Sequence, residues 1–204
     1  LEKATGKLSW KTRRSGELHE NPQLKKSYTT PLVLDMGGKP VLFSQGANWL
    51  YGYDPANGRE LWKVSYGTLG FSLSARPVAG HGMFFMSTGF MKPQMMAVKY
   101  ADMTTPEVAW TSAKSAPTMP SPLLVGDELY FVNDGGIFVC LDAKTGAEHY
   151  RERLAESDGQ KRMGGTYNAS PVLADGRIYV LNREGVTHVI APGRSYQKLA
   201  DNRL

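Results

Sequence analysis

The chain has 204 residues and a net charge of +5, from 24 Lys and Arg against 19 Asp and Glu, and 41% of its residues are hydrophobic. This composition is ordinary for a globular protein and excludes an extensively disordered chain, while the length suits one large all-β domain. The first 30 residues hold seven Lys or Arg and three Asp or Glu, in runs no longer than two. We interpret them as a solvated basic edge and expect no nucleic-acid partner; a patch that contacts a polyanion is the alternative.

The sequence holds a single cysteine, Cys140, within the apolar run 137–141. No disulfide can form within these residues, and the paired-cysteine motifs of metal and haem sites are excluded. The apolar neighbours predict a buried, inert thiol. No run of about 18 apolar residues occurs, so no transmembrane segment is predicted in these residues.

A unit recurs along the chain at intervals of 46, 45 and 49 residues, and each copy opens with a proline followed by an apolar run. The four opening residues are Pro31, Pro77, Pro122 and Pro171. Self-similarity at this period is typical of propellers and solenoids.

In chain order we predict an orphan strand over 7–14 and then four-stranded units over about 28–66, 74–112, 120–153 and 169–201. Turns rich in Gly and Asp separate short apolar runs within each unit, which predicts an antiparallel meander. One such sheet cannot bury both of its faces, so neighbouring sheets must pack face to face as propeller blades. The first strand of each blade lines the central channel, and its proline, which lacks an N–H, suits a strand start.

The fourth unit has its own last strand, 196–200, so it does not need the orphan strand to complete it. We therefore predict that residues 1–204 form about four blades plus one orphan strand of a larger ring. Closure into a four-bladed ring is the alternative.

Three segments resemble the blade-closing signature of the pyrroloquinoline-quinone (PQQ)-like repeat family: Thr5-Gly6-x-x-x-Trp10, Asp54-x-x-Asn57-Gly58-x-x-x-Trp62 and Asp142-x-x-Thr145-Gly146-x-x-x-Tyr150. The Gly of this signature permits a positive φ, the Asp accepts bonds from turn amides, and the Trp packs between blades with its N–H on a backbone carbonyl. The second unit keeps Trp110 but loses the Asp-Thr-Gly turn, and the fourth lacks both.

The resemblance covers essentially the whole chain and implies an all-β propeller. The same superfamily includes the outer-membrane assembly lipoprotein BamB. The resemblance therefore implies a non-catalytic platform that binds a protein or another envelope component in the periplasm or cell envelope. The alternatives are a sensor domain and a PQQ-dependent alcohol or sugar dehydrogenase. In such an enzyme PQQ lies over the channel and Ca²⁺ polarises its carbonyl. We expect no cofactor and no metal, because the sequence shows no carboxylate cluster at Ca²⁺-loop spacing.

Two regions are candidates for contacts with a ligand or partner. The residues just before the opening prolines should crowd one mouth of the channel, where three hydroxyls and a guanidinium could bind a small anion; they are Thr30, Arg76, Ser121 and Ser170. Hydrogen bonding at strand ends is the alternative role of these side chains. The second candidate is the excursion 90–94 in the second unit, which we predict to be a protruding contact loop.

Overall fold

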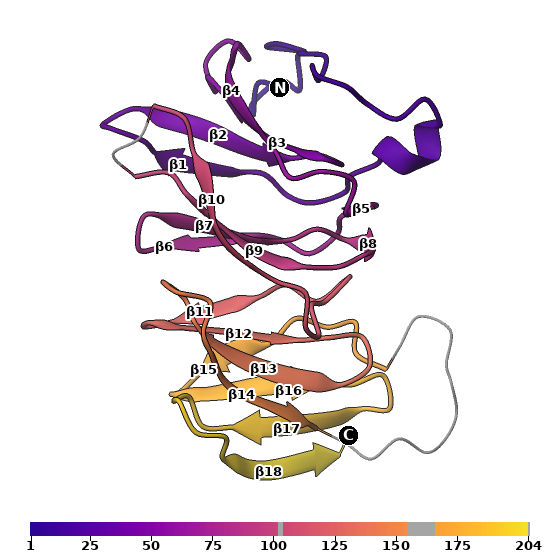
Figure 1. The fold of residues 1–204 in the computed structure, drawn as a ribbon, viewed down its shortest axis with the longest axis vertical. Coiled ribbons are helices and arrows are strands. Elements are labelled where there is room, and N and C mark those ends of the chain that lie inside the picture. The colour runs from indigo at the N-terminus through magenta and orange to yellow at the C-terminus, as the bar shows by residue number, and fades with distance from the viewer. Residues whose placement is uncertain (102–103, 155–165, 204) are drawn as a thin grey trace.

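The computed structural model describes residues 1–101, 104–154 and 166–203, which form strands, turns and one short 3-10 helix, η1 (Pro22–Lys25) (Figure 1). The strands of the first half are β1 (Leu32–Asp35), β2 (Pro40–Gln45), β3 (Trp49–Tyr53), β4 (Glu60–Ser65), β5 (Gly70–Phe71), β6 (Val78–Gly80), β7 (Met83–Ser87), β8 (Phe90–Met91), β9 (Met95–Lys99) and β10 (Glu107–Ser112). Those of the second half are β11 (Leu123–Val125), β12 (Glu128–Val132), β13 (Ile137–Asp142), β14 (Glu148–Arg153), β15 (Val172–Ala174), β16 (Arg177–Leu181), β17 (Val186–Ile190) and β18 (Lys198–Arg203).

Four four-stranded antiparallel sheets make up the fold, in the strand orders β1-β2-β3-β4, β6-β7-β9-β10, β11-β12-β13-β14 and β15-β16-β17-β18. The first strand of each sheet begins one residue after an opening proline. Strand β11 lies beside both β6 and β15, so first strands adjoin along one side of the stack, as the inner strands of propeller blades do.

The sheets form part of a propeller and do not close into a ring. In Figure 1 the sheet β1–β4 and the sheet β15–β18 lie at opposite ends of the described chain. The four-bladed closure considered from the sequence is therefore wrong, and the prediction of a partial ring is confirmed.

The strand predicted over 7–14 is also wrong: these residues form no strand. Their side chains bind the first sheet instead. The indole Nε1 of Trp10 donates to the carbonyl of Pro55 at 2.9 Å, and the Thr12 hydroxyl donates to the carbonyl of Gly58 at 2.6 Å. A strand needs a backbone ladder, and no described segment pairs with this one.

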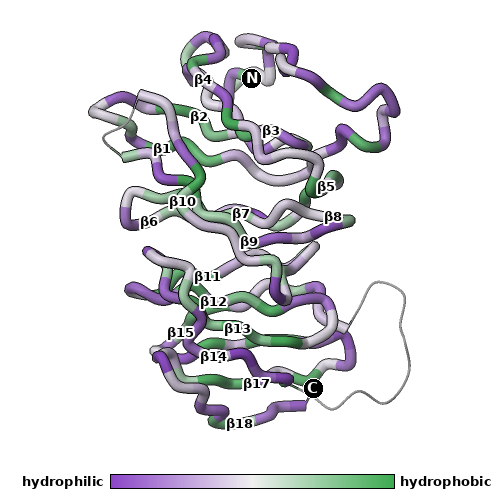
Figure 2. The backbone as a smooth tube through the Cα atoms, in the orientation of Figure 1, coloured by the Kyte–Doolittle hydropathy of each residue, from purple (hydrophilic) through white to green (hydrophobic). Residues whose placement is uncertain are grey.

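Apolar cores lie between consecutive sheets, because side chains alternate between the two faces of each strand. Phe84 faces the first sheet and packs on Phe43, with ring centroids 5.3 Å apart, while its neighbour Phe85 faces the third sheet with Leu129. Tyr130 in turn faces the fourth sheet. Figure 2 shows the resulting hydrophobic stretches along β12 and β13.

Tryptophan side chains fasten the outer strands of one blade to the turn of the next. Trp110 Nε1 donates to the carbonyl of Ala143 at 3.0 Å, and a Cβ at Gly146 would lie 2.7 Å from its ring atom Cδ2. Gly146 has a φ of +74°. Asp142 accepts the Thr145 hydroxyl at 2.9 Å and the amides of Thr145 and Lys144, and these bonds lower the pKa of its carboxyl. The role predicted for the Asp-Thr-Gly turn and the Trp is thus confirmed at this interface.

The second blade lacks the Asp-Thr-Gly turn, so Trp62 of the first blade has no such turn to pack on. Trp62 is buried and packs on Phe43, yet its Nε1 has no hydrogen-bond partner among the described residues. Tyr150, which replaces the tryptophan of the third blade, likewise has no described partner for its hydroxyl. Tyr130 bonds the fourth-blade turn instead, accepting the Gly193 N–H at 2.7 Å.

Replacing Gly146 with Ala tests this fastening against a matched glycine. Gly176 also has a positive φ, +70°, but open space where a Cβ would lie. Both variants introduce backbone strain of about 1–2 kcal/mol. Gly146→Ala also overlaps the Trp110 ring, so we expect it to lose about 1–3 kcal/mol more in urea unfolding than Gly176→Ala. Equal losses would show that the indole does not rest on this glycine.

A chain of hydrogen bonds, which begins at buried Tyr167 and His188, holds the last strand of the fourth sheet in place. Tyr167 and His188 are 1% and 2% exposed, and the Tyr167 hydroxyl lies 2.8 Å from His188 Nε2. His188 Nδ1 lies 2.6 Å from Asp201 Oδ1, and Lys198 Nζ donates to the other oxygen at 2.8 Å. The carboxylate can only accept, so the Nδ1 proton points to Asp201.

The bond from Lys198, followed by that from His188, lowers the pKa of the Asp201 carboxyl. A carboxyl whose pKa is lowered by folding adds stability above its unfolded value, about 4, and that stability is lost as the pH falls towards the folded value. We expect the wild-type protein to lose more stability between about pH 5 and pH 2 than Asp201→Asn does. Chemical unfolding at each pH measures this, and parallel curves would rule out the linkage.

Candidate functional site

One edge of the stacked sheets, here named the loop face, carries the linkers that connect consecutive sheets. It comprises the turns after each second strand, the linkers between sheets and the segment around η1, and these lie together on the right of Figure 1. Three of those turns are short, 46–48, 133–136 and 182–185, whereas the second sheet has 88–94, which includes β8. The described linkers are 66–77 and 113–122.

Three of the four channel-mouth candidates are linked in a row on this face. The backbone N–H of Arg76 donates to Ser121 Oγ at 2.8 Å, and the N–H of Ser121 donates to Ser170 Oγ at 2.9 Å. No described hydrogen bond joins Thr30 to them. The two serine hydroxyls thus fasten neighbouring sheets to each other. Anion binding by these side chains stays a prediction.

A second row of polar residues was not singled out from the sequence. Each closes or directly follows the second strand of its sheet; they are Gln45, Ser87, Asn133 and Asn182. Gln45 Nε2 donates to the Ser87 carbonyl at 2.5 Å, and Asn133 Oδ1 accepts turn amides. The signal for them was available, because a polar residue ends an apolar run at the same place in every repeat.

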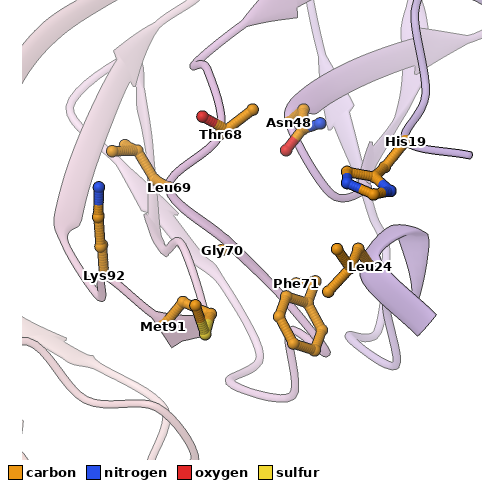
Figure 3. Close-up of a pocket in the computed structure, with 9 residues that line it drawn as sticks. All are labelled: His19, Leu24, Asn48, Thr68, Leu69, Gly70, Phe71, Met91 and Lys92. Atoms are coloured by element: carbon orange, nitrogen blue, oxygen red, sulfur yellow. The ribbon is translucent and has the colours of Figure 1, made fainter. Parts of the chain in front are cut away.

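A pocket of about 200 Å³ opens on the loop face between the first two blades (Figure 3). Its apolar walls are Leu24, Leu69, Phe71 and Met91, and the other lining residues are His19, Asn48, Thr68, Gly70 and Lys92. The residues come from four separate segments: η1 and its approach, the first-blade turn, the linker and the second-blade excursion. The pocket therefore depends on the packing of the two blades.

The excursion 90–94 protrudes at this pocket. Its strand β8 pairs with β5, and the Phe71 and Phe90 rings lie 5.7 Å apart edge to face. Phe90 and Met91 nevertheless remain 55% and 64% exposed. Met91 also has a φ of +102°, which non-glycine residues rarely adopt.

Thr88 holds the base of this excursion. Its side chain is fully buried, and its Oγ1 donates to the Lys92 carbonyl at 3.1 Å and accepts the Gln94 N–H at 2.9 Å. The Lys92 N–H donates to the Leu69 carbonyl at 2.9 Å. These bonds fix the excursion against the linker and so set the shape of the pocket.

The pocket lining supplies hydrogen-bond donors and no carboxylate. Lys92 has no ion-pair partner among the described residues. His19 Nδ1 accepts the Asn21 N–H at 3.0 Å, which leaves Nε2 as the donor of a neutral ring. Two acidic residues, Glu17 and Glu20, line an adjoining cleft of about 450 Å³ that shares His19, Asn48 and Thr68 with the pocket.

Outside the pocket, burial raises the pKa of several side chains. Cys140 is buried, and burial raises the pKa of its thiol to about 12. Burial likewise raises the pKa of Tyr51 and of Tyr53 to about 12. Within the described ranges, no three His, Cys, Asp or Glu side chains converge as a metal site would require. No helix in the same ranges is long and apolar enough to cross a membrane.

No family model matches the sequence, and no curated protein matches it either. Solved structures do resemble the fold. The quinohaemoprotein alcohol dehydrogenase ADHIIG of Pseudomonas putida HK5 aligns with 97% of this chain and 36% of its own, at 13% identity and a TM-score of 0.68. The C-terminal domain of Pseudomonas aeruginosa PilY1 aligns with 74% and 38%, at 16% identity and a TM-score of 0.55. BamB of Moraxella catarrhalis aligns with 84% and 63%, at 15% identity and a TM-score of 0.43.

These likenesses establish the class of fold. The chain forms part of a β-propeller, as its repeats and signature segments predicted, and its fold is similar to that of a quinohaemoprotein alcohol dehydrogenase. It spans about a third of the length of the quinohaemoprotein it matches.

Removing the Thr88 hydroxyl should loosen the excursion without unfolding the blades. Thr88→Val keeps the side-chain shape but leaves the Gln94 N–H and the Lys92 carbonyl without their partner, at a cost of about 1–3 kcal/mol. We expect faster amide hydrogen exchange confined to 89–94. Thr111→Val, at an exposed strand position with no described side-chain bond, is the control. Unchanged exchange at 89–94 would contradict the role of Thr88.

Proposed function

We propose that this chain is part of a non-catalytic propeller that binds a protein partner through its loop face, in the periplasm or cell envelope. The observation that carries the proposal is the exposed apolar excursion at Phe90 and Met91, beside an open pocket. Apolar side chains at a rim, set in a rigid scaffold, are typical of protein contact sites. The envelope location follows the family resemblance and is part of the proposal.

A PQQ-dependent dehydrogenase is the second candidate, because the fold resembles that of a quinohaemoprotein alcohol dehydrogenase. The residues present here do not fit the PQQ and Ca²⁺ pair. The acidic side chains of the described residues gather in no group of three, and the hydroxyls of Ser121 and Ser170 are engaged between sheets. Cys140 is the single cysteine of residues 1–204 and is buried in a blade interface, where burial raises the pKa of its thiol to about 12. We therefore derive no catalytic step through the cofactor.

A photo-crosslinking residue at position 90 of the full-length protein tests the proposal. We expect it to join one defined envelope protein in cells, because Phe90 is exposed on the contact face. The same residue at position 39, in the exposed β1–β2 turn on the opposite edge, should give no such product.

Titration with PQQ and Ca²⁺, followed through the cofactor's absorbance, addresses the enzyme alternative. Saturable binding with reduction of an acceptor dye, lost in Ser121→Ala/Ser170→Ala, would overturn the proposal. Equal crosslinking at positions 39 and 90 would also contradict it, because contact would then not be confined to the loop face.

A further inference from the structure

The loop-face pocket has the size of one large side chain. Its volume is about 200 Å³, and a water molecule takes about 30 Å³ in the liquid, so the space holds about seven such volumes. That is less than the 300 Å³ or more of ordinary small-molecule sites, and it is enough to take up one Phe or Leu side chain. Buried aromatic or aliphatic anchors of this size dominate many protein interfaces.

The polar groups of the pocket favour a carboxylate on one side of that anchor. Figure 3 shows Lys92 and His19 on opposite sides, with Gly70 and Phe71 between them. Glu17 and Glu20 line the cleft beyond His19 and disfavour a carboxylate there. Lys92, which has no described ion-pair partner, lies on the side away from them. The site therefore combines an apolar pocket with one lysine, Lys92, at its edge.

Two of the six described non-glycine residues with positive φ line the same pocket. Among described non-glycine residues with positive φ, Asn48 at +68° and Met91 at +102° line the pocket, and Ser72 at +53° follows its Phe71 wall. Such conformations cost about 1–3 kcal/mol each and cluster at ligand clamps. Strain is independent of the apolar lining and points to the same place.

We propose that this pocket is a socket for the apolar C-terminal residue of a partner protein. The side chain fills the space between Leu24, Leu69, Phe71 and Met91, and the terminal carboxylate meets Lys92. A C-terminal residue supplies both groups at once, an apolar side chain for the space and a carboxylate for Lys92, which belongs to the same lining. This inference rests on the proposed function and specifies the partner's chemistry.

The test uses short peptides on the full-length protein, with binding followed by the backbone amide NMR shift of Gly70, which lines the pocket and is unchanged in every variant below. Acetyl-Ala-Phe with a free carboxylate should bind and saturate. Its C-terminal amide should bind about threefold to fivefold more weakly, as expected for a solvent-exposed ion pair. Acetyl-Ala-Ala with a free carboxylate lacks the anchor and should not saturate over the same range.

Two variants separate the socket from its rim. Met91→Gly removes an apolar wall at a φ that glycine adopts freely, so we expect an unchanged or higher midpoint of unfolding together with at least fivefold weaker binding of acetyl-Ala-Phe. Lys92→Gln should make the free acid and the amide bind equally. Lys39→Gln, at an exposed lysine in the β1–β2 turn, is the matched control and should change neither.

Each outcome decides one point. Equal binding of acid and amide to the wild-type protein would overturn the role of Lys92, and unchanged binding to Met91→Gly would overturn the socket. Stronger binding of acetyl-Phe-Glu-amide than of acetyl-Ala-Phe would replace the C-terminal residue with an internal anchor. If the peptides fail while crosslinking at position 90 succeeds, this inference fails and the proposed function stands.

Discussion

The contact on which the blade arrangement depends is the tryptophan that lies on a glycine of the next turn. Trp10 rests on the turn at Gly58, and Trp110 rests on the turn at Gly146, each with its indole N–H on a backbone carbonyl. A flat ring can come this close only where no Cβ intervenes. At the inner edge, backbone amides bonded to Ser121 and Ser170 hold the second, third and fourth sheets together. Apolar cores fill the space between the two fastenings.

The interface between the first two blades departs from this scheme at both edges. Trp62 has no described partner for its Nε1, because the second blade lacks the turn that would receive it. Compensation comes from the linkers, where the N–H of Tyr28 donates to the Leu73 carbonyl and the N–H of Ser72 donates to the Lys26 carbonyl. Buried Gln45 adds a bond to the Ser87 carbonyl. The first two of these bonds bring the linker 66–77 against the segment that follows η1, and this linker forms part of the pocket. The irregular interface and the candidate site are therefore one region.

Much of the fold could be read from the sequence, because it depends on local signals. The opening prolines, the Gly and Asp turns and the alternation of apolar residues each act over a few residues, and they predicted four meanders. Local signals could not decide whether residues 7–14 form a strand, because a strand exists only where another segment pairs with it. The same limit applied to Thr30, which shares its sequence position with Ser121 but not its hydrogen bond.

The site was harder to predict than the fold, because the pocket joins four segments that are distant in the sequence. The excursion 90–94 was recognisable as extra residues, but its bond to Leu69 and its place in one pocket with Leu24 depend on how two blades and a linker pack. Its polar base at Thr88 carries no signature, since a threonine after a strand is common. Burial of Gln45 and Ser87 could be suspected from their repeated position, whereas the direction of their bonds required the neighbouring sheet.

The excursion also carries a conformational cost that the shorter turns of the other sheets avoid. The other sheets connect their second and third strands through three or four residues, so a blade of this kind is complete without 88–94. Met91 occupies a strained conformation while most of its side chain and that of Phe90 stay exposed. Strain of about 1–3 kcal/mol is retained where surrounding structure or a partner compensates for it. Burial of apolar surface contributes about 25 cal/mol per Å², so a partner covering both side chains would supply a compensation of that order. The energetics of the excursion thus favour a surface that is completed by contact with another molecule.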